Sequence, residues 1–129
     1  MNRTKFDPSI EAKNTMIDLI INLRDDIFTS HEEKNDLIAV EFYFKNFHHD
    51  TIMNHFINKV LPYKKQIINR DVQFFLKNDS IFAGLPEDRI NYYSKIVASG
   101  KRISEDYRIT IWEYFDSLIA LAELYQKNK

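Results

Sequence analysis

The chain has 129 residues, of which 44% are hydrophobic and 29% are charged, with a formal net charge of −1 and no cysteine. The absence of cysteine excludes a disulfide framework, thiolate metal ligands and thiol catalysis. The sequence pI of about 6.4 argues against a dedicated nucleic-acid binder, which normally carries a basic excess. Length and composition predict one folded domain over residues 1–129.

The apolar segments indicate no targeting or membrane element. Residues 1–13 contain no apolar run and no cleavage-site pattern, so no signal peptide is expected. Charged residues interrupt every apolar-dense stretch, so no membrane span is predicted. The lack of cysteine fits a reducing compartment, and we expect an intracellular location.

A first helix is predicted close to the N-terminus. Asp7 is placed to cap it, with Pro8 as its first residue, because proline has the backbone angle that a first helical turn needs. The helix is expected to end near residue 28. Its core-facing residues recur every three or four positions, at Met16, Ile20, Leu23 and Ile27.

A second helix is predicted to begin after Ser30, because Ser30 and Glu33 have the spacing of a capping box. Its expected core stripe is Leu37, Val40, Phe44 and Phe47. Phe42 and Tyr43 lie beside this stripe, which gives the helix more apolar surface than a monomer covers. The two residues are therefore a candidate interface with a second copy or another protein. The alternative, in which the segment around Phe6 covers them, stays open.

The third and fourth helices are predicted on either side of a proline. Asp50 is expected to cap a helix that ends at Val60. Its core-facing residues are Met53, Phe56, Ile57 and Val60. Pro62 then marks a boundary, because proline lacks a helical donor and clashes with the preceding turn. A further helix is expected from Tyr63 to about Leu76.

The second half of the chain continues the helical pattern. Residues 78–80 form a turn cluster, and residues 86–88 open a helix that Gly100 ends. Ser104 begins the last helix, which reaches Tyr125. Its apolar stripe is Ile111, Phe115, Leu118, Ala122 and Tyr125. No stretch shows sustained period-two alternation, so the sequence predicts an all-α, compact bundle of about five to six helices.

Three histidines are the candidate metal ligands. His48, His49 and His55 lie near Asp50 at the junction of two helices, and nitrogen and oxygen donors in such a cluster could hold a divalent metal. However, adjacent histidines are expected to point in different directions, and none of the familiar zinc spacings occurs. The favoured interpretation is a polar helix–helix turn, so no metal and no other cofactor is predicted.

A basic run offers a candidate nucleic-acid contact. Lys59, Lys64, Lys65 and Arg70 recur at helical spacing, and lysine and arginine bind phosphates. The alternative is the solvated side of a helix. The overall charge does not favour nucleic-acid binding, which is kept as the second hypothesis.

Two aromatic segments have a catalytic or binding interpretation beside a structural one. Asp71 near Phe74 and Phe75 could act as a general base, and Trp112 could stack on a nucleobase. Acidic residues surround Trp112 on its helix, whereas a stacking platform needs a cationic groove. The sequence therefore predicts that Trp112, Phe74 and Phe75 fill the core.

The second half of the chain also carries a resemblance. The matching segments are residues 58–67, Arg70-Asp71 with Phe74-Phe75, residues 81–85, residues 104–106 and residues 111–116. They resemble a group of small, uncharacterised helical proteins of nucleocytoplasmic large DNA viruses, mimivirus relatives among them. The resemblance implies a viral accessory or virion-associated protein, in the host cytoplasm or in the virion. No catalytic residues come with it. The absence of catalytic motifs and the surplus of apolar helix surface predict that the protein is non-enzymatic and acts through protein–protein contacts.

Overall fold

The computed structural model describes residues 6–78 and 81–128, and the regular structure within these ranges is entirely helical. The long helices are α1 (Pro8–Asp26), α2 (His31–Asn46), α3 (His49–Lys59), α6 (Glu87–Ser99) and α7 (Glu105–Lys127). The short ones are the 3₁₀ turn η1 (Leu61–Tyr63), α4 (Lys64–Ile68) and α5 (Gln73–Lys77). The predicted all-α bundle is confirmed. The residues of the predicted turn at Asp79 and Ser80 lie outside the described ranges.

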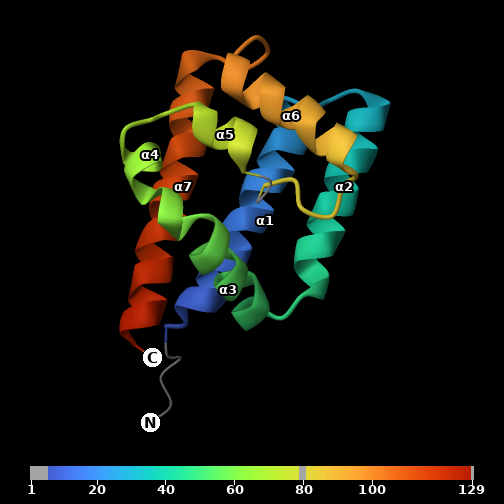
Figure 1. Ribbon diagram of the computed structural model, residues 1–129. Helices are drawn as coiled ribbons and strands as arrows, with labels where there is room; N and C mark the ends of the chain where they lie inside the picture. Colours follow the sequence, from blue (N-terminus) through green and yellow to red (C-terminus); the bar gives the residue numbers. More distant parts are fainter. Residues whose placement is uncertain (1–5, 79–80, 129) are drawn as a thin grey trace.

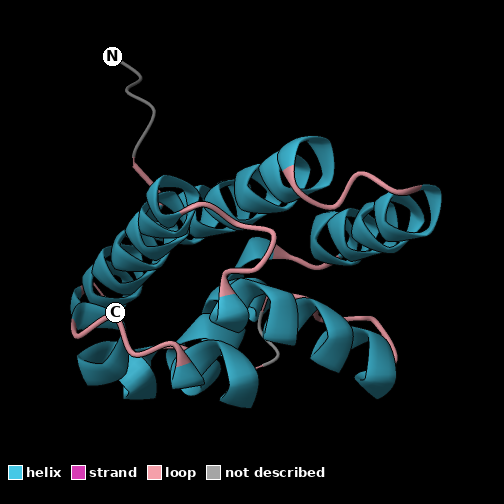
Figure 2. Ribbon diagram, turned by 90° about the horizontal axis from the view of Figure 1, so that it is seen from above, coloured by secondary structure: helices cyan, strands magenta, loops and turns pink. Residues whose placement is uncertain are grey.

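Helix α1 is the centre of the bundle. It packs against α7, α2 and α3, and Figure 1 shows it between α7 on one side and α2 on the other. Helix α6 lies across one end, where it packs against α5. Seen from above, the helices enclose a shared core (Figure 2). No helix of the described chain combines the length and the hydrophobicity needed to cross a membrane.

Local cap chemistry sets most of the predicted helix boundaries. The Asp7 carboxylate accepts a hydrogen bond from the Ser9 N–H at 2.9 Å, with Pro8 as the first helical residue. Ser30 and Glu33 form the reciprocal capping box at the start of α2. Gly100 ends α6 at a φ of 71°, which glycine adopts without steric cost. These boundaries agree with the sequence prediction.

The start of α3 differs from the prediction. The N-cap is His48, which accepts a hydrogen bond from the Asp50 N–H through Nδ1 at 3.2 Å. Asp50 lies in the first helical turn instead, where its negative charge faces the positive end of the helix dipole. Asp50 therefore stabilises the helix N-terminus, but His48 caps it.

The predicted single helix from Tyr63 to Leu76 was wrong, because the chain turns at Arg70. Arg70 has a φ of 56°, its N–H donates to the Ile67 carbonyl, and the Asp71 N–H donates to the Gln66 carbonyl. This is the Schellman arrangement that ends a helix. The Asp71 carboxylate then accepts a hydrogen bond from the Gln73 N–H at 3.0 Å and starts α5. Asp71 is thus a turn residue whose carboxylate accepts a backbone hydrogen bond.

Two predictions about the core have opposite outcomes. Trp112 is buried, with 3% of its surface exposed, and its ring lies 4.5 Å from Phe75 and 6.3 Å from Phe74 between centroids. Phe47 was expected in the core but is 40% exposed. It is the residue that follows α2, and its extended backbone takes it out of the helical repeat. Ile27, Ile57 and Tyr125 of the predicted stripes are only partly buried.

Candidate functional site

The outward face of α2 carries the most exposed apolar side chains of that helix. Phe42 is 69% exposed and Ile38, one turn earlier, is 51% exposed. The helix buries Leu37, Val40 and Phe44 on its other side. We call the exposed stripe the α2 outer face; it consists of His31, Lys34, Asn35, Ile38, Phe42, Lys45 and Asn46. These side chains are exposed, and Figure 1 shows that α2 lies at the edge of the molecule.

Phe42 and Tyr43 have different surroundings, although the sequence grouped them. Tyr43 is partly buried beneath the loop at Gly84, where a Cβ would lie 2.8 Å from the Tyr43 ring. Gly84 has a φ of 94°, so this close approach depends on glycine. Phe6 is itself exposed, and the cover over Tyr43 comes from the Gly84 loop. Of the predicted interface pair, only Phe42 is largely exposed to solvent.

The three histidines do not form one group. His55 lies on a small cavity of about 80 Å³ between α2 and α3. This cavity is lined by Tyr43, Phe44, Phe47, Thr51, Ile52 and His55. His48 and His49 lie instead at the start of α3, with Asp50.

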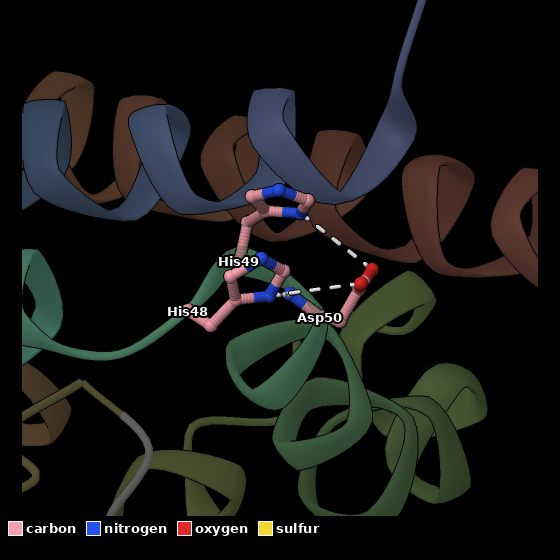
Figure 3. Close-up of side chains that lie close together, drawn as sticks. All are labelled: His48, His49 and Asp50. Atoms are coloured by element: carbon pink, nitrogen blue, oxygen red, sulfur yellow. Dashed lines mark hydrogen bonds and ion pairs between the residues drawn. The ribbon is translucent and has the colours of Figure 1, made fainter.

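The side chains of His48 and His49 lie together, contrary to the prediction. Their ring centroids are 4.0 Å apart, with 32° between the ring planes. The Nδ1 atom of His48 lies 3.6 Å from Asp50 Oδ2, and that of His49 lies 3.5 Å from Asp50 Oδ1 (Figure 3). The backbone is extended at His48 and helical from His49 onward. This change of conformation brings the adjacent rings to the same side of the chain.

Residues of α1 and α7 hold this cluster in place. His49 Nδ1 lies 2.6 Å from the Ser9 hydroxyl, which donates to Asp7 at 2.6 Å. The Tyr125 hydroxyl donates to Asp50 Oδ1 at 3.1 Å. The hydrogen bond from Ser9 lowers the pKa of Asp7. Three helices therefore position one polar cluster.

The candidate nucleic-acid residues do not form one free cationic face. Lys64 is paired with Glu123 at 2.6 Å, and Arg70 makes two 2.8 Å hydrogen bonds to Asp116. Lys59 lines a separate pocket of about 440 Å³ between α3, α5 and α6. The two carboxylates of α7 reduce the charge that Lys64 and Arg70 present to a phosphate. The role of these pairs is to attach the 64–70 segment to α7.

Sequence reasoning missed two ion pairs beside α2. Glu33 is only 3% exposed and accepts hydrogen bonds from Arg102 at 2.6 and 2.9 Å and from the Tyr92 hydroxyl at 2.7 Å. The Arg102 hydrogen bonds lower the pKa of Glu33 to about 2. Asp36 pairs with Arg89 at 2.7 Å in the same region. The capping box identifies Glu33, but no local pattern reveals a partner 69 residues away.

No family model, curated protein or solved structure matches the chain. The likeness of the segments between Asn58 and Tyr125 to proteins of large DNA viruses remains an expectation from the sequence. The α2 outer face and the His48–His49–Asp50 cluster are therefore assigned from their own geometry and chemistry.

Proposed function

We propose that the protein is a non-enzymatic helical protein that acts through protein–protein contacts, with the α2 outer face as its contact surface and a second copy of the chain as its partner. The observation that carries the proposal is the 69% exposure of Phe42 on a regular helix. A large aromatic side chain gains considerable free energy when a partner covers it.

The size of the surface supports an interface with an apolar centre. The exposed parts of Ile38 and Phe42 amount to on the order of 200 Å² of apolar surface, because a large aromatic side chain covers about 150–250 Å². A specific interface buries about 800 Å² per partner, in which an apolar centre is surrounded by a polar rim. The polar residues of the α2 outer face supply that rim.

The arrangement of charges on this face fits pairing with itself. In an antiparallel pair of α2 helices with the two-fold axis midway between Ile38 and Phe42, each Ile38 packs on Phe42 of the second copy. The same symmetry places Lys45 of one copy in the layer of Asn35 of the other, and the Asn35 amide oxygen can accept a hydrogen bond from that ammonium. Lys45 is also paired with Glu41 of its own helix at 2.6 Å, which balances its charge beside Lys34 of the second copy.

Phe42→Ser tests the interface against a matched control. Light scattering at about 100 μM, where a dimer of micromolar Kd is populated, should give the wild type twice the 15.5 kDa mass of the chain. We expect Phe42→Ser to return the mass to that of one chain. Ile109→Ser, at a half-exposed position of α7, should leave the dimer unchanged.

Two results would contradict the homodimer. One is a wild type that scatters as a single chain, and the other is a dimer that survives Phe42→Ser. Far-ultraviolet circular dichroism should show the same helical signal in both variants, because each replaces an exposed side chain.

The viral part of the proposal is supported by the resemblance of the segments between Asn58 and Tyr125 and by a composition rich in Phe, Tyr, Ile, Asn and Lys, which fits an AT-rich genome. On this basis the protein is an accessory or virion-associated protein of a large DNA virus. Immunodetection in purified virions and in infected-cell extracts tests it. Absence from both would oppose the assignment.

A further inference from the structure

The cluster at the start of α3 brings three metal-ligating side chains together. We propose that His48, His49 and Asp50 bind a divalent first-row transition metal such as Zn²⁺. One donor atom from each of the three residues lies within 4.8 Å of the other two. Figure 3 shows both imidazole rings on the same side of Asp50, with a nitrogen of each facing the carboxylate.

The spacing of the donor atoms suits a transition metal. Zinc bonds to histidine nitrogen and carboxylate oxygen are about 2.0–2.2 Å long, so neighbouring ligands of a tetrahedral ion lie roughly 3.3–3.5 Å apart. His48 Nδ1 lies 3.6 Å from Asp50 Oδ2, and His49 Nδ1 lies 3.5 Å from Asp50 Oδ1. Small side-chain movements would therefore bring these donors to coordination distance.

Neighbouring helices orient the ligands. The Tyr125 hydroxyl holds the Asp50 carboxylate through Oδ1 at 3.1 Å. An outer-shell hydrogen bond of this kind fixes the direction of a metal ligand and raises affinity. Ser9 contacts His49 at Nδ1 itself, at 2.6 Å, so it positions the ring in the metal-free protein only.

Metal binding would replace two hydrogen bonds of the free protein. His48 Nδ1 accepts a hydrogen bond from the Asp50 N–H. On metal binding this hydrogen bond would break, and the Nδ1 lone pair would point to the ion. The Ser9 hydroxyl donates to Asp7, so His49 Nδ1–H donates to Ser9. The Nδ1 proton of His49 must move to Nε2 before Nδ1 can coordinate. Ser9 keeps its bond to Asp7.

The chemistry of the donors selects the metal. Two imidazoles and one carboxylate suit Zn²⁺, Ni²⁺ or Cu²⁺, whereas Mg²⁺ and Ca²⁺ prefer oxygen ligands alone. His48 is exposed and Asp50 is half-exposed, so water can complete the coordination sphere. The site is separate from the α2 outer face, and its failure would leave the homodimer proposal untouched.

Calorimetric titration of the tag-free protein with ZnCl₂ tests the site. We expect one Zn²⁺ per chain, and Mg²⁺ in the same assay should not bind. His48→Asn removes the imidazole but keeps a preferred N-cap side chain, and Asp50→Asn removes the carboxylate. Each should weaken Zn²⁺ binding at least about tenfold, a loss that even an outer-shell change can cause. His31→Ala, which removes an exposed histidine of α2, is the matched control and should bind as the wild type does.

Thermal unfolding provides a second readout, because a ligand that binds only the folded chain raises its Tm. Zn²⁺ should raise the Tm of the wild type and of His31→Ala, and should not raise that of His48→Asn or Asp50→Asn. The proposal is overturned if the wild type binds no Zn²⁺, if both cluster variants bind it as tightly as the wild type, or if His31→Ala abolishes binding.

Discussion

Trp112→Ala should lower the free energy of unfolding by about 3–5 kcal/mol, the usual cost of truncating a large aromatic side chain in a core. The indole is 3% exposed and lies against Phe74 and Phe75. The guanidinium of Arg70 lies 5.6 Å from its ring centroid, so the substitution also removes a cation–π contact. The cavity would open beneath the segment that joins α4 to α5.

Urea denaturation followed by circular dichroism measures this loss, because the method does not depend on the deleted tryptophan. Phe42→Ala is the matched control: it truncates an aromatic side chain that is 69% exposed, and we expect a change within about 0.5 kcal/mol. A loss below about 1 kcal/mol for Trp112→Ala would mean that the indole is not part of the core. That result would support a surface role in stacking or binding.

The helix boundaries that were predicted correctly are those set by hydrogen bonds or backbone preferences of residues close together in the sequence. The Asp7–Ser9 cap, the Ser30–Glu33 capping box and the glycine stop at Gly100 all join groups close in the chain. The residue types alone therefore indicate them. The same local logic identified Ser104, whose side chain accepts a hydrogen bond from the Tyr107 N–H.

The boundaries that were wrong depend on distant residues or on an uncommon cap. The turn at Arg70 needs a positive φ in a residue other than glycine, which is unfavourable in isolation. Two hydrogen bonds to Asp116, 46 residues away, hold Arg70 in that position. Histidine is not among the favoured N-cap residues, so the pattern at residues 48–50 indicated Asp50 rather than His48.

The same distinction applies to the candidate sites. An excess of aromatic residues on the second helix predicted that some would face outward, and Phe42 does. Tyr43 lies under Gly84, which belongs to a loop 41 residues later in the chain. Helical periodicity does not describe such a contact. The convergence of His48 and His49 depends on the change of backbone conformation between them, and spacing rules for zinc motifs do not include it.

Glu33 should make the stability of the protein depend on acid pH. Its pKa is lowered from the usual 4.5 to about 2, first by the hydrogen bonds from Arg102 and then by those from Tyr92 and Ser30. Between these values the unfolded chain binds a proton that the folded chain does not, so stability rises with pH. The contribution is complete above about pH 5 and is lost as the pH falls towards 2. Because Arg102 is partly exposed to solvent, we expect about 2 kcal/mol rather than the full value of the shift.

Glu33→Gln isolates this contribution, because glutamine keeps the size of the side chain and does not titrate. Urea unfolding at a series of pH values from about 2 to 6, which spans both pKa values, should show a smaller loss of stability in acid for Glu33→Gln than for the wild type. Glu113→Gln, at an exposed position of α7, is the matched control and should keep the wild-type slope. At neutral pH Glu33→Gln should itself be less stable, because Arg102 then lacks its charged partner. If the variant and the wild type lose stability in acid to the same extent, another carboxylate is responsible, and the Glu33–Arg102 pair does not control the acid stability of the fold.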